Sequence, residues 1–329
     1  MRYIFSTFIL IFIFSGCSSK HYYEPINHQY SLDDDTKILI TPDYIKDINA
    51  KSATLDNNMF LDKNGISKKP LPKGYFYINL DDDNFLAANK TNNLLIVKTG
   101  EILKFRSNVI AATSQGDIFA LVFANNSIGI YDKSIKQFKL KKYLKPTPLN
   151  DTRITMPIFL DKIILIPTLN GQVVVVDKTK YKVIKILTID PQSEVKNIIL
   201  LETSHDILLA GSNNKILSIG SGTIHNKEFF IQSYMLDDKY LYVAALDGTV
   251  YKFDLLLNII VKKKFKYAKF QALAIGKNDI YLVESQGYIV KLSKDFTKVT
   301  TYSFPFDEDE KIFATKNKLY IEDKLLIVK

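Results

Sequence analysis

The single cysteine, Cys17, is the residue whose position in this chain most clearly suggests chemistry. It stands directly after the small residues Ser15 and Gly16, and an uncharged apolar run, residues 3–14, precedes them behind Arg2. Such a run is shorter than the roughly 20 residues that a membrane-spanning helix needs, and it is typical of the hydrophobic part of an export signal. The thiol therefore lies where such a signal would be cut, and a lone cysteine in an exported chain needs an explanation of this kind.

Residues 14–17 (FSGC) resemble a bacterial lipobox. The resemblance implies that residues 1–16 are a signal peptide, that cleavage follows Gly16, and that Cys17 carries diacylglycerol on sulfur and an acylated amine. Several acyl chains hold a protein stably on a membrane, whereas one binds only marginally. The next residue is Ser18 and not aspartate, which implies sorting to the outer membrane. We expect the periplasmic face, with exposure at the cell surface as the alternative.

Other reactive side chains form no recognisable constellation. The four histidines are scattered: His21, His28, His205 and His225. No pair of them has the spacing of a zinc site, and His205 is predicted to be a turn residue. The acidic triplets at 33–35 and 81–83 lack the glycine and the later glutamate of a calcium loop, so both are predicted to be solvated loops. The sequence thus predicts no catalytic, cofactor or metal site, and a protein that is not an enzyme.

The formal net charge is +9, and all but three of the 44 basic residues are lysines. Proteins that read nucleic acids depend on arginine for bidentate contacts, so this composition and the export signal exclude nucleic acid as the expected partner. A solvated lysine surface is expected instead, and it would attract anionic lipid or an acidic protein. With Cys17 lipidated no disulfide can form, so the mature chain must rely on its core.

Beyond residue 36 the chain consists of short β-branched and aromatic runs separated by Asn, Asp, Gly and Lys. Such runs predict strands bounded by turns, for example at 163–166, 173–176, 240–243 and 279–283. Residues 17–35 show no apolar period and are predicted to be a lipidated, flexible tether.

A repeat runs through the strand-rich part. Segments 161–177 and 238–254 align without a gap, and 278–292 is a third copy. Each contains a strand, a turn such as Asn170-Gly171, and a second strand; an Asn-Gly turn is expected to need positive φ at both central residues. Weaker copies extend the series, and the second turn residues lie 33 to 45 residues apart, at 93, 126, 171, 214, 248, 287 and 323. A period near 40 of all-strand units predicts an all-β propeller with four-stranded blades.

Seven markers predict about seven blades, with eight or six as alternatives. Segment 44–75 has the poorest pattern, and a degenerate eighth blade would lie around 53–61. The last copy ends at Lys329 after its second strand, so residues 37–40 are expected to supply an outer strand that closes the ring. The predicted propeller domain is 36–329.

The repeat resembles the PQQ-like propeller repeat, in which a turn is followed by an apolar strand ending in aspartate. Residues 170–177 and 247–254 carry the likeness, and Asp132 keeps the aspartate in a weaker copy. The Thr-Gly pair that often follows in that family occurs once, at Thr99-Gly100. Tryptophan, common in that family, is absent. No quinone or calcium site is therefore carried over.

A lipobox followed by such a propeller resembles the BamB-type lipoproteins of outer-membrane β-barrel assembly. The resemblance implies a non-enzymatic periplasmic scaffold that binds other proteins, a barrel-insertion protein among them. Two alternatives stay open. One is a surface-exposed lipoprotein for ligand binding or adhesion, and the other is a propeller enzyme with a site in its central channel.

Overall fold

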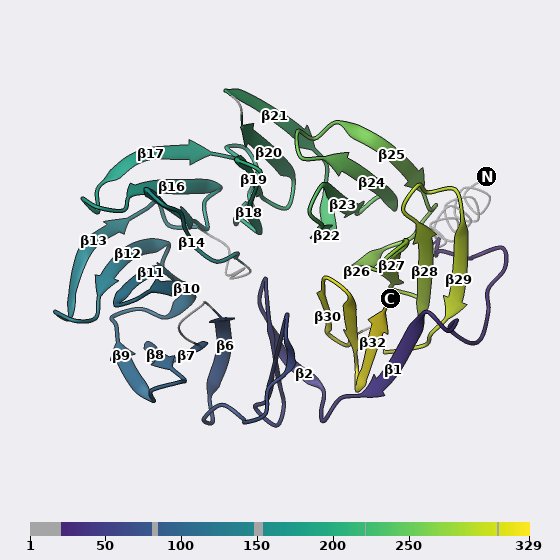
Figure 1. The fold of residues 1–329 in the computed structure, drawn as a ribbon, viewed down its shortest axis with the longest axis horizontal. Helices are drawn as coiled ribbons and strands as arrows, with labels where there is room; N and C mark the ends of the chain where they lie inside the picture. Colours follow the sequence, from purple (N-terminus) through teal and green to yellow (C-terminus); the bar gives the residue numbers. More distant parts are fainter. Residues whose placement is uncertain (1–20, 81–84, 148–153, 221, 308) are drawn as a thin grey trace, which may run out of the picture.

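The computed structural model describes residues 21–80, 85–147, 154–220, 222–307 and 309–329. Eight four-stranded antiparallel sheets stand around a ring, as Figure 1 shows. The all-β propeller is confirmed, and the number of blades is eight, the upper of the values that the repeat allowed.

The strands follow one another blade by blade. The first blade contains β2 (Ile45–Ile48), β3 (Ala53–Leu55), β4 (Phe60–Asp62) and β5 (Gly65–Ile66). The second contains β6 (Tyr75–Leu80), β7 (Phe85–Asn89), β8 (Asn93–Ile96) and β9 (Glu101–Lys104). The third contains β10 (Val109–Gln115), β11 (Ile118–Phe123), β12 (Ser127–Asp132) and β13 (Gln137–Tyr143). The fourth contains β14 (Ile158–Phe159), β15 (Ile163–Pro167), β16 (Gln172–Asp177) and β17 (Val183–Thr188).

The other four blades repeat this order. The fifth contains β18 (Leu200–Ser204), β19 (Ile207–Gly211), β20 (Lys215–Gly220) and β21 (Thr223–Glu228). The sixth contains β22 (Ile231–Leu236), β23 (Tyr240–Ala245), β24 (Thr249–Asp254) and β25 (Ile259–Lys264). The seventh contains β26 (Phe270–Ile275), β27 (Asp279–Glu284), β28 (Tyr288–Ser293) and β29 (Val299–Ser303). The eighth contains β30 (Ile312–Thr315), β31 (Lys318–Ile321), β32 (Lys324–Val328) and β1 (Thr36–Ile40).

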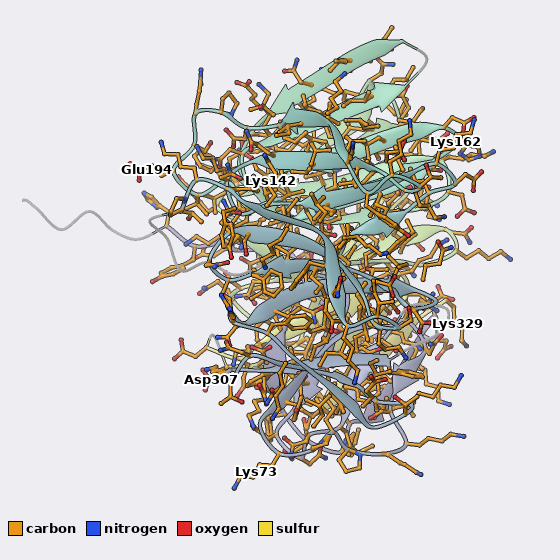
Figure 2. All side chains as sticks on the ribbon, turned by 90° about the vertical axis from the view of Figure 1, so that its left-hand side faces the viewer. Lys73, Lys142, Lys162, Glu194, Asp307 and Lys329 are labelled. Carbon is orange, nitrogen blue, oxygen red and sulfur yellow. The ribbon has the colours of Figure 1, made fainter. Side chains whose placement is uncertain are left out.

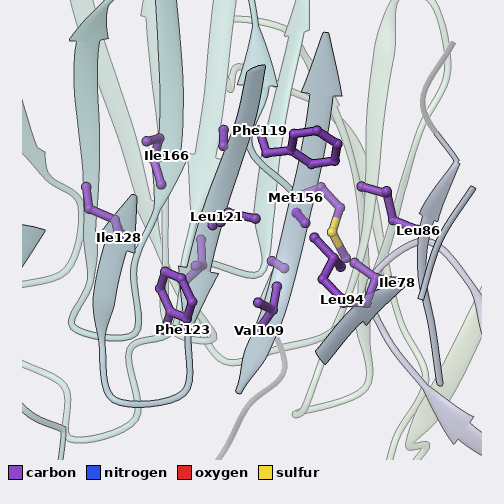
Figure 3. Close-up of a cluster of buried hydrophobic side chains, with 14 of the residues drawn as sticks. Ile78, Leu86, Leu94, Val109, Phe119, Leu121, Phe123, Ile128, Met156 and Ile166 are labelled. Atoms are coloured by element: carbon purple, nitrogen blue, oxygen red, sulfur yellow. The ribbon is translucent and has the colours of Figure 1, made fainter. Parts of the chain in front are cut away.

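The hydrophobic core lies between neighbouring blades. In Figure 3, Phe119, Leu121 and Phe123 of β11 pack among side chains of the blades on either side, such as Leu86 and Ile166. Both faces of the middle strands are covered, so these strands are continuous apolar runs, whereas the outer strands are largely exposed. Aromatic residues also pack within this core, for example the fully buried Tyr242.

The ring closes through its two chain ends. β1 pairs antiparallel with β32, with Thr36 opposite Val328 and Ile40 opposite Lys324. The expectation that residues 37–40 supply the missing outer strand is therefore confirmed. Its exposed side chains contribute little burial, so backbone hydrogen bonding holds this seam.

The first blade, which corresponds to the degenerate copy expected around residues 53–61, is the segment that shows the repeat least. β3, β4 and β5 have three, three and two residues, which is too short for a visible alternation. Its turn nevertheless carries the signature of the others, because Asn58 has a φ of 64°, as Asn126 has a φ of 55°.

The turns differ in one detail from the expectation. Gly171 and Gly248 have positive φ, but Asn170 and Asp247 are not among the residues with positive φ. The loop between β23 and β24 is three residues long, and the Gly248 N–H donates to the Ala245 carbonyl at 2.9 Å. This is a type I turn followed by one left-handed residue, so the prediction of two positive φ values was wrong.

The segment predicted as a tether contacts the seventh blade from residue 21 onward. Tyr23 is buried edge-on against Phe265 and Tyr288, and Gln29 pairs with Tyr302 of β29 as a short parallel bridge. In Figure 1 this stretch passes outside β29 before it enters β1. We call residues 21–35 the strap. Residues 17–20 of the predicted flexible tether lie outside the described part, so their flexibility stays a prediction. The strap, in contrast, is packed on the propeller.

The ring has two distinct faces. One bears the blade-to-blade loops and the turns between second and third strands, and we call it the connection face. The opposite face bears the turns between first and second strands. Figure 2 shows Lys73, Glu194 and Asp307 of blade-to-blade loops on one side, and Lys162 and Lys329 on the other.

Candidate functional site

Cys17, the predicted lipidation site, lies outside the described residues, and its modification stays a prediction. Within the described part of the chain, no helix is long and apolar enough to cross a membrane. His205 lies in the turn between β18 and β19 with a φ of 49°, so its prediction as a turn residue is confirmed.

The first acidic triplet is not simply solvated. Lys291 of β28 has an ammonium that lies 2.6 Å from a carboxylate oxygen of Asp33 and 2.9 Å from one of Asp35. The Tyr302 hydroxyl also donates to Asp33, at 2.8 Å. The Lys291 side chain is 13% exposed, whereas those of Asp33 and Asp35 are 32% and 61% exposed, so water reaches the pair mainly from the acidic side. Two of the three acids thus fasten the strap to the propeller, and the triplet 81–83 lies outside the described residues.

These contacts shift pKa values in opposite directions. Burial acts to lower the pKa of Lys291, but its hydrogen bonds to Asp33 and Asp35 outweigh burial and raise it. For Asp33, burial acts to raise the pKa, and the bonds from Lys291 and Tyr302 bring it below its usual value. Both shifts favour the charged pair.

The propeller encloses a hollow along its central channel. It has a volume of about 1030 Å³, and the first strand of every blade, or the residue next to it, contributes to the lining. Its polar lining includes Asp47, Glu202 and Lys311, and the amides of Asn79 and Gln271. Burial raises the pKa of Asp47, and the nearby Lys311 is the first of three lysines that oppose this shift.

One ion pair crosses the channel. The Lys51 ammonium of the β2–β3 turn lies 3.0 Å from a Glu202 carboxylate oxygen in β18. These residues belong to the first and fifth blades, which stand on opposite sides of an eight-bladed ring. The turn is held in this position because Asn49 donates to the Tyr77 carbonyl at 2.7 Å and caps the Ser52 N–H at 2.9 Å.

The channel does not contain a recognisable catalytic centre among the residues described. No group of three or more His, Cys, Asp or Glu side chains in that part of the chain is arranged to hold a metal ion. The sequence-based prediction of a non-enzymatic protein is not tested by this observation and stays a prediction.

The rim of the ring presents lysines on outer strands. Lys139 of β13, Lys185 of β17 and Lys262 of β25 are exposed on three different blades. Of the three, Lys139 has a carboxylate partner among the described residues, Asp132 at 3.6 Å. Outer strands keep such side chains in water, where long cationic groups are available to an acidic partner.

Eight four-stranded blades around a channel, with a lysine-bearing rim, define an eight-bladed β-propeller. No family model matches the chain. Two plasminogen-binding proteins PgbB of Helicobacter pylori, from strains J99 and 26695, are each 23% identical to it. Their alignments cover 95% of this chain and 69% and 68% of the relatives.

Two solved structures share the fold. BamB from Moraxella catarrhalis superposes with a TM-score of 0.62 at 14% identity, covering 91% of this chain and 98% of BamB. The C-terminal WD40 domain of Sif2 superposes with a TM-score of 0.63 at 13% identity, covering 92% and 99%. At such identities the likeness shows the propeller fold alone.

Proposed function

We propose that this protein is a lipid-anchored bacterial surface protein whose propeller binds another protein, with plasminogen as the first partner to test. The similarity to the two PgbB proteins carries the proposal, because it extends over 95% of the chain and therefore includes most of the propeller. A surface-exposed binding lipoprotein was the alternative to the assembly scaffold in the sequence-based interpretation, and this similarity favours it.

The rim supports the same function. Lys139, Lys185 and Lys262 stand on rigid outer strands, so little conformational entropy of the backbone is lost when a partner contacts them. The formal charge of +9 adds a long-range attraction that raises association rates with an acidic partner at low ionic strength.

The test is direct binding of the purified propeller to immobilised plasminogen. We expect saturable binding that weakens with salt. The lysine analogue 6-aminohexanoic acid should displace the bound protein, because it competes with the rim lysines. The rim variant Lys139→Gln/Lys185→Gln/Lys262→Gln should bind several-fold more weakly.

A matched control separates position from total charge. Lys68, Lys69 and Lys73 are exposed on the β5–β6 loop, and their replacement by glutamine removes the same charge. This control should bind like the unaltered protein. An equal loss of binding in both variants would mean that total charge, and not the position of the rim lysines, causes the binding. Absence of binding by the unaltered protein would reject plasminogen as the partner.

The assembly scaffold stays the second candidate, because β1 offers an exposed strand edge. Ile38, Leu39 and Ile40 are exposed there, and such an edge can accept a strand from a partner. The fold itself does not decide for this candidate, since the Sif2 domain superposes as well as BamB does.

Cross-linking in membranes distinguishes the two candidates. Recovery of a barrel-insertion protein with the intact chain, and its loss with Cys17→Ala, would support the scaffold. Labelling of the chain by a reagent that cannot enter intact cells would support surface exposure and oppose a purely periplasmic scaffold.

A further inference from the structure

Exposed aromatic and large apolar side chains gather on the connection face around the sixth and seventh blades. Phe230 is 62% exposed and Leu246 46%, in the loop before β22 and the turn after β23. Tyr267 follows in the loop between β25 and β26, and Tyr22 and Ile26 project from the strap. We call these five residues the anchor-side patch.

The loops and the strap that carry the patch contact one another. The Leu246 N–H donates to the Phe230 carbonyl at 2.8 Å, which joins the first two loops. The Phe265 N–H donates to the Gly248 carbonyl at 2.9 Å, which joins the turn after β23 to the loop bearing Tyr267. The His21 ring stacks on Tyr267 with centroids 4.8 Å apart, which brings the start of the strap to the same place.

The position of the strap indicates what covers this patch. Only four peptide units separate His21 from Cys17, so an acylated Cys17 cannot lie farther from His21 than about 14 Å. Tyrosine and phenylalanine beside aliphatic side chains are preferred at the boundary between water and lipid. Lys266 and Lys269 are exposed in the same loop and carry the charge that anionic headgroups attract.

We propose that the anchor-side patch rests on the lipid bilayer in which the chain is anchored. This inference rests on the proposed lipid anchor at Cys17 and assigns it an orientation. The connection face is turned to the membrane, the opposite face is turned away from it, and the rim faces sideways, where a partner can reach it. The lipid and the patch act as two membrane signals, so the ring is held in one pose and does not swing on its anchor.

The test measures the reactivity of single lysines in the lipidated protein, reconstituted in vesicles of phosphatidylethanolamine and phosphatidylglycerol. An amine-reactive reagent is applied to the vesicles and to the same protein in detergent, and modified peptides are counted by mass spectrometry. Lys266 reports on the patch, and the exposed Lys162 on the opposite face is the internal reference. We expect Lys266 to react several-fold more slowly on vesicles than in detergent, with Lys162 unchanged.

Variants show whether the patch causes the protection. Phe230→Ser/Leu246→Ser/Tyr267→Ser should stay on the vesicles through its lipid but lose the protection of Lys266. Ile135, Ile184 and Val299 are exposed apolar residues that belong to the rim or the opposite face, and their replacement by serine should leave the protection intact.

Each other outcome counts against the inference. Equal reactivity of Lys266 in vesicles and detergent, in protein whose N-terminal peptide carries acyl chains, overturns the orientation and leaves the anchor standing. An N-terminal peptide without acyl chains would overturn both the lipid anchor and the orientation. Protection of Lys266 by added plasminogen and not by vesicles would assign the patch to a protein partner.

Discussion

Gly248 lies where the backbone and a neighbouring loop leave no room for a side chain. Its φ is 82°, and an added Cβ would lie 2.2 Å from the Phe265 carbonyl oxygen. Gly100 has a φ of 74°, but an added Cβ there would meet no atom within 4 Å. The two glycines therefore separate the cost of the conformation from the cost of the clash.

Replacing each glycine by alanine should reveal this difference. Gly100→Ala should lower the free energy of unfolding by about 1 kcal/mol, the cost of a left-handed residue with a Cβ. Gly248→Ala should lower it by about 3 kcal/mol or more, since backbone must also move. Urea denaturation followed by fluorescence measures both, and equal losses would contradict the clash.

Lys141 is a lysine whose ammonium lies among aromatic rings. Its Nζ is 3.2 Å from the centroid of the Phe123 ring and 4.9 Å from that of Phe138. Burial lowers the pKa of Lys141 from 10.5 to about 8. Between these pH values the unfolded chain binds more protons at this residue than the folded chain does.

The folded protein should therefore gain stability from Lys141 as the pH rises from about 8 to 10.5. Lys141→Met removes the group, so the variant should be more stable than the unaltered protein at pH 7, and the difference should shrink across that range. Thermal unfolding of both proteins at each pH measures it. A constant difference, or a pKa near 10.5 by NMR, would show that the aromatic rings hold the charged form instead.

At the scale of elements, the seam between β1 and β32 depends on alternate backbone groups. The Lys329 N–H donates to the Asp35 carbonyl at 3.1 Å, and the Thr41 N–H donates to the Asp323 carbonyl at 2.7 Å. Hydrogen-bonded pairs alternate along an antiparallel ladder, so the Leu39 N–H faces β32 and the Ile38 N–H faces outward.

Proline scanning tests this seam. Leu39→Pro removes a hydrogen bond of the closure, and we expect it to cost about 3 kcal/mol of unfolding free energy and to lower the melting temperature. Ile38→Pro changes the neighbouring exposed apolar residue but removes no ladder bond, so its cost should be clearly smaller. The reverse order would mean that the register of the seam differs from the one described.

Much of this element-level structure follows from the sequence. The repeat at 161–177 and 238–254 predicted the strands, the propeller and the closing strand at 37–40. The first blade was hidden because its short strands show no alternation, although Asp56-Asn57-Asn58 was a detectable turn signal. Packing of the strap was not predictable, since Tyr23 and Asp33 follow no period and their partners are more than 200 residues away.

At the scale of the whole molecule, the pair between Lys51 and Glu202 spans the ring. No sequence pattern connects these residues, so the channel lining was the part of the candidate site that one sequence could not supply. Their side chains are 41% and 28% exposed, and water therefore screens the attraction.

A double-mutant cycle measures what this pair contributes. Lys51→Met, Glu202→Gln and the double variant should give a coupling energy of about 0.2–1 kcal/mol, the range for exposed pairs. Binding of plasminogen should be unchanged, since the rim is untouched. A coupling energy above about 3 kcal/mol would show that the channel excludes water as a buried site does.

The pairing of Thr36 with Val328 joins the first and the last strand of the propeller. A nascent or partly exported chain cannot make this contact until β32 is available, and seven blades can stack before then. Loop closure over such a distance is slow compared with the formation of local hairpins. Completion of the ring therefore reports that the chain has arrived as far as β32, and a product that ends before β32 is left with an open strand edge that proteases and chaperones can recognise.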